Sequence, residues 1–94
     1  MKINFYATLR AIVGKKTVDF DIPHGAPLRD VVAEVVRLYP AMQRELFDEH
    51  GNLYQHVHVL VNGRDSPYLE NQLDTPITPE DTINIFPAVG GGAS

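Results

Sequence analysis

The sequence has no cysteine among its 94 residues. This absence excludes disulfide bonds, zinc sites built on thiolates, cysteine nucleophiles and persulfides carried on a side chain.

A long apolar run and a basic run are also missing. No stretch approaches the roughly 18 apolar residues of a membrane-spanning helix, and the start MKINFYATL lacks the pattern of a signal peptide. We therefore expect a cytoplasmic protein that contacts no membrane. Lys15-Lys16 is the only adjacent basic pair and the formal charge is −4, so nucleic acid is an unfavourable partner.

The length is that of a single domain. Hydrophobic residues make up 44% of the chain, which argues against wholesale disorder. A chain of this size cannot enclose a large cofactor cavity and also keep a core, so we expect no bound cofactor.

Alternating apolar residues predict two strands near the start. Residues 2–8 place three apolar side chains on one face, Ile3, Phe5 and Ala7. Residues 17–22 alternate in the same way, with Val18, Phe20 and Ile22 inward. The short connection, with a turn near Gly14-Lys15, predicts a hairpin.

The period then changes to that of a helix. Apolar residues recur three and four positions apart: Leu28, Val31, Val32, Val35, Leu38 and Tyr39. Pro27 suits the first helical position, and Pro40 ends the helix. A short second helix is expected over residues 42–47.

The second half returns to strands. Residues 56–62 alternate with valines inward, and Asn62-Gly63 predicts a tight turn. Residues 64–81 predict a loop with a single helical turn at most, and residues 82–86 predict the last strand. The order β-β-α-β-β predicts an α+β domain with one helix across one face of a sheet.

The end of the chain, FPAVGGGAS, holds three of the seven glycines. Glycine has no side chain to pack and loses more conformational entropy on ordering than any other residue. Three in a row are useful where a backbone must thread a space too narrow for a Cβ. The alternative is an inert terminal linker.

The order of elements and this ending resemble the MoaD/ThiS family of ubiquitin-like sulfur carriers over the whole chain. The matching pieces are MKINFYATLR, LRDVVAEVVRLYP, VLVNGRD and INIFPAVGGG. The resemblance implies a β-grasp domain over residues 1–89, with a mixed sheet and one main helix, and a flexible Gly-rich tail over residues 90–94. Residues 38–63 are also similar to the carriers of cysteine biosynthesis and to related small modifiers of archaea and bacteria.

In that family the chemistry takes place on the C-terminal carboxyl group. The resemblance implies that an E1-like enzyme uses ATP to adenylate this group. A sulfur donor then displaces AMP and leaves a thiocarboxylate, and a client enzyme takes the sulfur for cofactor or cysteine biosynthesis. The chain itself would be a protein cosubstrate and not an enzyme. Gly92 would carry the reactive carboxyl group, and Gly91 would precede it.

Ala93-Ser94 depart from the Gly-Gly ending of the family's active forms. Either a protease removes them and exposes Gly92, or they come from the expression vector. The sequence leaves both explanations open.

A sheet with one helix has a second, free face. Alternation predicts the side chains that point to it: Asn4, Tyr6, Thr8, His58, Leu60, Asn84 and Phe86. Tyr6, Leu60 and Phe86 would form an apolar patch beside the tail, and the family docks on its adenylating partner through this kind of surface. We assign partner binding to this patch together with Pro87, Val89 and Gly90.

The histidines predict no metal site. His56 and His58 share a strand face, but the sequence offers no third and fourth ligand with the required reach.

Three other functions stay open at this point. A ubiquitin-like modifier would be joined through the carboxyl group of Gly92 to a lysine of a target protein. The small subunit of molybdopterin synthase would insert its tail into a large subunit. A plain binding module with an inert tail would do neither.

Overall fold

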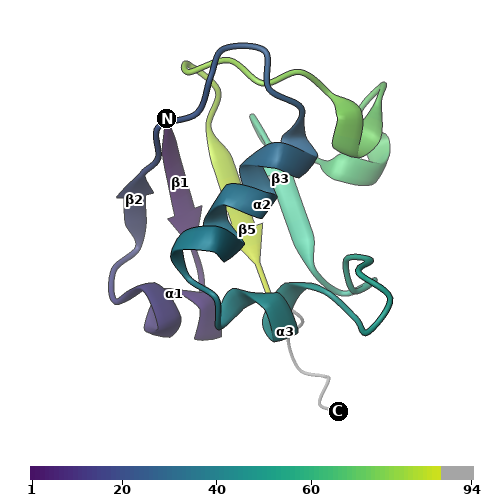
Figure 1. The fold of residues 1–94 in the computed structure, drawn as a ribbon. Helices are drawn as coiled ribbons and strands as arrows, with labels where there is room; N and C mark the ends of the chain where they lie inside the picture. The colour runs from purple at the N-terminus through teal and green to yellow at the C-terminus, as the bar shows by residue number, and fades with distance from the viewer. Residues whose placement is uncertain (88–94) are drawn as a thin grey trace.

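The computed structural model describes residues 1–87 and contains one mixed sheet with a helix across one face (Figure 1). Its five strands lie in the order β2-β1-β5-β3-β4. They are β1 (Lys2–Phe5), β2 (Thr17–Asp19), β3 (His58–Val61), β4 (Arg64–Asp65) and β5 (Ile83–Phe86). β1 and β5 pair in parallel, and the other neighbours are antiparallel. The predicted α+β arrangement of the β-grasp type is confirmed. The predicted tail, from Gly90 onward, lies outside the described residues.

The main helix, α2 (Leu28–Leu38), crosses the sheet because one of its faces is apolar: Leu28, Val31, Val32 and Val35 are buried. Pro27 stands just before the helix with ψ 152°, one position earlier than predicted. Leu38 was predicted to be buried but is 47% exposed. Tyr39 takes the next inward place instead, with its ring centroid 6.4 Å from that of Phe20. None of the helices within residues 1–87 is long and apolar enough to cross a membrane.

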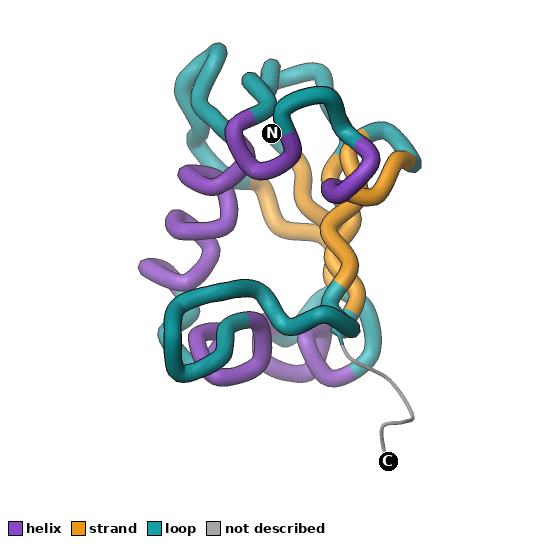
Figure 2. The backbone as a smooth tube through the Cα atoms, turned by 90° about the vertical axis from the view of Figure 1, so that its right-hand side faces the viewer, coloured by secondary structure: helices purple, strands orange, loops and turns teal. Residues whose placement is uncertain are grey.

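Helix α2 stands apart from the sheet and faces it, and the core lies between the two (Figure 2). The inward residues of the three central strands have no or almost no exposed surface: Ile3, Phe5, Ile83, Ile85, Val59 and Val61. Burial of each large side chain contributes about 1.5–3 kcal/mol. The inward valines and isoleucines predicted for the first strand and for the last two predicted strands are therefore core residues, whereas Val18 and Ile22, also predicted inward, are only half-buried against the core.

The link between β1 and β2 contains a short helix, α1 (Thr8–Val13), which the sequence analysis missed. Strand β1 ends at Phe5, and Ala7 reverses the chain with φ 53° and ψ −127°. The prediction of a strand through Thr8 with Ala7 inward is wrong, because Ala7 is exposed and Leu9 is buried in its place. The predicted pairing of the two strands is correct, with Ile3 opposite Val18.

The second half follows the prediction with two differences. The short helix α3 (Met42–Leu46) is present, and Asn62-Gly63 forms a turn with φ 52° and 86°. This turn leads into β4, which the sequence analysis assigned to a loop because two residues are too few to show alternation. Two 3-10 turns follow, Ser66–Tyr68 and Gln72–Asp74.

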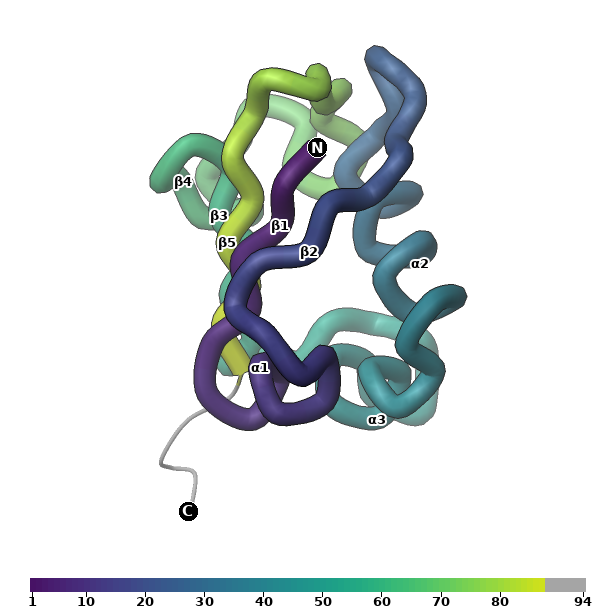
Figure 3. Tube along the Cα trace, turned by 90° about the vertical axis from the view of Figure 1, so that its left-hand side faces the viewer, coloured from purple at the N-terminus to yellow at the C-terminus, as the bar shows by residue number. Residues whose placement is uncertain are grey.

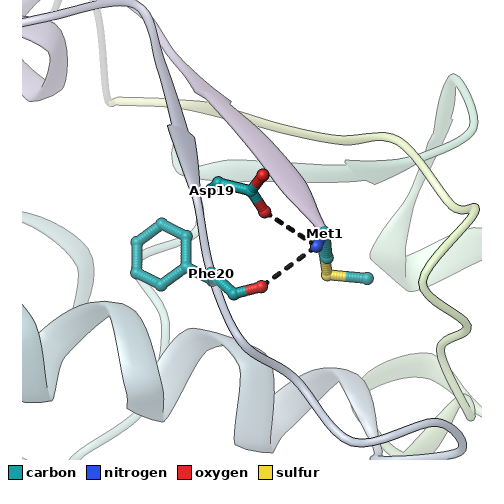
Figure 4. A network of polar contacts seen from close by, with 3 residues as sticks. All are labelled: Met1, Asp19 and Phe20. Atoms are coloured by element: carbon teal, nitrogen blue, oxygen red, sulfur yellow. Dashed lines mark hydrogen bonds and ion pairs between the residues drawn. The ribbon is translucent and has the colours of Figure 1, made fainter.

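The edge strand β2 is tied to the first residue of the chain (Figure 4). The ammonium group of Met1 donates to the Asp19 carboxylate and to the Phe20 carbonyl oxygen, each at 3.0 Å. The amide of Phe20 in turn donates to the Met1 carbonyl oxygen at 2.7 Å. These contacts hold the first residue of the chain against the end of β2, the short strand at one edge of the sheet.

Candidate docking face beside the last strand

The face of the sheet opposite α2 is built from the residues that alternate with the core. Asn4 lies opposite Asn84 across the parallel β1–β5 pair, and Tyr6 follows β1 and reaches the same Asn84 side chain. From β3, His58 lies opposite Phe86 and Leu60 opposite Asn84. The structure thus gathers the predicted face residues except Thr8, which begins α1.

Tyr6 and Phe86 form a stacked aromatic pair at the end of this face. Their ring centroids are 4.2 Å apart and the ring planes differ by 11°. Both side chains are half-buried, so one side of the pair is accessible to a partner. Such an aromatic pair contributes about 0.5–1.5 kcal/mol beyond the area that it buries.

A polar network fixes the tyrosine ring. The hydroxyl of Tyr6 and the amide of Asn4 both donate to the side-chain oxygen of Asn84, each at 2.9 Å. Thr17 donates to the side-chain oxygen of Asn4 at 2.6 Å, which extends the network to β2. The sequence analysis placed Asn4 and Asn84 on this face but did not recognise that they orient Tyr6.

Charged groups flank the aromatic pair. The ammonium nitrogen of Lys16 lies 5.4 Å from the centroid of the Tyr6 ring, within the range of a cation–π contact. On the other side, Nδ1 of His58 lies 2.6 Å from a carboxylate oxygen of Asp65. His58 and Asp65 do not form part of a metal site, because residues 1–87 contain no group of three His, Asp or Glu side chains that could hold a metal ion.

Leu60 extends the apolar surface, because it is half-buried and lies opposite Asn84, two residues before Phe86 in β5. Pro87 was assigned to the same surface, but it is buried directly after β5 and offers little accessible area to a partner. The remaining predicted site residues, Val89, Gly90, Gly91, Gly92 and Ala93, lie outside the described residues. Their roles stay predictions.

This arrangement is suited to binding a protein rather than to catalysis. An aromatic pair in which a hydrogen bond to Asn84 orients Tyr6 and stacking orients Phe86 gives contact area at low entropic cost. It stands where β5 ends, and Gly90 follows Phe86 four positions later in the sequence. The hollows beside α2, of about 320 and 350 Å³, are lined by other residues.

Comparison with known proteins extends this description. The ThiS family matches residues 3–92. Small archaeal modifier protein 3 of Haloferax volcanii is 30% identical over 92 residues, which cover 98% of this chain and 98% of that protein. The crystal structure of SAMP1 from Haloferax volcanii has a TM-score of 0.83 at 30% identity, covering 97% of both chains. A chain of the Amycolatopsis orientalis BexX/CysO complex has a TM-score of 0.77 at 26% identity, covering 97% of this chain and 98% of that one.

Proposed function

The chain belongs to the ThiS family, and on that premise we propose that it acts as a ubiquitin-like small modifier. Members of this group are non-catalytic carrier or modifier proteins, and ThiS-family carriers bind no cofactor. In the proposal, Ala93-Ser94 are removed and the carboxyl group of Gly92 is joined to lysine amines of other proteins.

One observation carries the proposal: the chain is similar, over nearly its whole length, to a protein named a small archaeal modifier. The sequence analysis put the sulfur carrier first and the modifier second, and the similar proteins favour the reverse order. The triple glycine falls within the residues that match the family. This supports a role for the tail and disfavours an inert linker.

The chemistry would follow from activation by an E1-like enzyme, which the family implies. A carboxylate oxygen of Gly92 attacks the α-phosphorus of ATP, and pyrophosphate leaves. A lysine amine of the target then attacks the acyl carbon, AMP leaves and the amine loses a proton. This chain would supply the carboxylate and the Tyr6–Phe86 face on which the enzyme docks.

A sulfur carrier is the second candidate, favoured by the likeness to a chain of the BexX/CysO complex. In that case sulfide, delivered by a sulfur donor, displaces AMP from the same intermediate and leaves a thiocarboxylate for a client enzyme. The absence of cysteine fits this chemistry, because the carboxyl terminus is then the group that carries sulfur. Both candidates share the activation step and differ in the product.

Mass spectrometry of proteins from the native host separates these products. Arg64 is the last basic residue, so trypsin would leave a long remnant, residues 65–92, on each modified lysine. The substitution Ala88→Arg adds a cleavage site and shortens that remnant to Val-Gly-Gly-Gly. We expect this remnant on lysines of several host proteins, and none when Gly91 and Gly92 are deleted.

The intact mass of the unconjugated protein completes the test. A chain that ends at Gly92 with sulfur in place of oxygen, and no lysine remnants, would replace the modifier by the sulfur carrier. If this protein, isolated from its native host, keeps Ser94 on every molecule and forms neither product, both candidate functions are refuted.

A further inference from the structure

The charges of this chain are unevenly distributed along the sequence. Residues 1–18 contain four basic residues and no acidic one. Residues 19–94 contain the other four basic residues and all twelve acidic ones, so their formal charge is four minus twelve, or −8. Three of the early basic residues are exposed neighbours, and we call them the basic flank: Arg10, Lys15 and Lys16.

The end of α1 brings these three residues together. Gly14 caps the helix with φ 90°, and its amide donates to the Arg10 carbonyl oxygen at 2.8 Å. Lys15 and Lys16 follow at once, and the Lys16 carbonyl oxygen accepts from the Phe5 amide at 2.7 Å. The basic flank therefore lies at the end of the molecule where β1 and β5 both finish (Figure 3).

The basic flank is not neutralised within the described part of the chain. The ion pairs of residues 1–87 use other cations, among them Arg29 with Asp74 and Arg37 with Glu34. Arg10, Lys15 and Lys16 form no ion pair among these residues. Because the Lys16 ammonium lies over the Tyr6 ring, the flank is continuous with the aromatic pair.

We propose that the basic flank binds an acidic surface on the protein that docks on the Tyr6–Phe86 face. This inference rests on the proposed function and specifies the chemistry of the partner. The net charge of −4 repels an acidic protein overall, whereas the basic flank attracts it, so the flank would turn the aromatic pair toward the partner during approach. The strongly negative remainder of the chain disfavours nucleic acid as the occupant.

The test measures how fast the protein associates with the purified E1-like enzyme of the same organism, alongside adenylation. The variant Lys15→Gln/Lys16→Gln removes two charges from the flank and keeps the length of the side chains. The matched control, Arg29→Gln/Arg37→Gln, removes two charges from α2, on the other side of the sheet. Arg29 and Arg37 are both exposed, so replacing them should leave the fold intact.

We expect the flank variant to associate roughly tenfold more slowly at low salt and the control to match the wild type. In about 1 M salt, where charges are screened beyond about 3 Å, the difference should disappear. An equal slowing in the control would show an effect of net charge alone and overturn the inference. Unchanged association of the flank variant would overturn it as well.

Measuring association and adenylation separately distinguishes a failure of this inference from a failure of the proposed function. Flank-dependent association without adenylation would uphold the basic flank and refute the proposed activation. Normal adenylation with association that does not depend on the flank would uphold the proposed activation and refute the basic flank. Failure to form any complex would refute both. Binding of a DNA duplex that is lost in the flank variant, with association to the enzyme unchanged, would assign the flank to nucleic acid and overturn the inference.

Discussion

Ala7 has a backbone conformation that glycine adopts far more easily than alanine. Its φ of 53° and ψ of −127° put it outside the regions that L-residues prefer. Such strain costs on the order of 1–3 kcal/mol. The contacts on either side of Ala7 maintain this backbone conformation. Leu9 is buried in the core after the turn, while Tyr6 lies on the free face before it.

Replacing this alanine should therefore stabilise the protein. We expect Ala7→Gly to raise the free energy of unfolding by about 1 kcal/mol, the relief of strain less the extra entropy of glycine. Urea denaturation measures the change. Ala11→Gly, an exposed site within α1, is the control and should lower stability by about 1 kcal/mol. Equal destabilisation by both substitutions would show that Ala7 is unstrained.

Phe86 should matter for docking more than for folding. Phe86→Asp removes the stacked pair and about 0.5–1.5 kcal/mol of stability, but it leaves the buried core residues beneath in place. We expect adenylation by the E1-like enzyme to fall at least about tenfold, as for the loss of a central contact residue. Leu38→Asp, an exposed apolar residue of α2, is the matched control and should have no effect. Unchanged adenylation kinetics of the Phe86 variant would remove this residue from the docking face.

Apart from Thr8, sequence alternation predicted the side chains that share the free face, and it placed Tyr6 and Phe86 in one apolar patch, but it did not predict that their rings stack. Period-two alternation depends only on local geometry, so Tyr6 and Phe86 could be assigned to one face. Their stacking depends on the parallel register of β1 and β5, strands from opposite ends of the sequence. No local pattern encodes that register.

At the scale of elements, the strength of the local signal decided what could be predicted. Helix α2 has four buried residues over eleven positions, and its periodicity was clear. Helix α1 has one buried residue over six positions, so its apolar residues were absorbed into a predicted strand and turn. Strand β4 has two residues and is defined by pairing with β3, which alternation cannot show.

The hairpin of β3 and β4 is joined to the loop before β5 by Asp81. Its carboxylate accepts from the Thr78 amide at 2.8 Å and from the Asn62 side chain at 2.9 Å. Burial by itself would raise the pKa of Asp81, but these hydrogen bonds outweigh it and hold the pKa below its usual value.

This lowered pKa predicts a dependence of stability on pH. Because the pKa is lower in the folded state, the stabilisation by Asp81 is complete above the pKa of an unfolded aspartate, about 3.9. It is lost as the pH falls through the lower folded value. We expect Asp81→Asn to be less stable than the wild type at neutral pH, and the difference in urea midpoint to shrink below about pH 4. Glu80→Gln, an exposed neighbour, should show no such trend, and a constant difference for the Asp81 variant would contradict the assignment.

At the scale of the whole molecule, the core and the reactive terminus should be separable. Within residues 1–87, the buried core residues run from Ile3 to Ile85, which all precede the three C-terminal glycines in the sequence. Deleting Gly91 and Gly92 should therefore abolish adenylation and shift the melting temperature by less than about 2 °C, as for a surface change. A calorimetric scan and a pyrophosphate-exchange assay measure the two effects. A shortened chain that is still adenylated would rule out the carboxylate chemistry.

In the proposed function, the parallel pairing of β1 with β5 at the centre of the sheet would couple activation to the integrity of the fold. Tyr6 and Phe86 meet only when the first and last strands lie side by side. A misfolded copy would still display its glycines but would lack the assembled aromatic pair. An enzyme that recognises this pair would thus proofread each molecule and spend ATP on correctly folded copies alone.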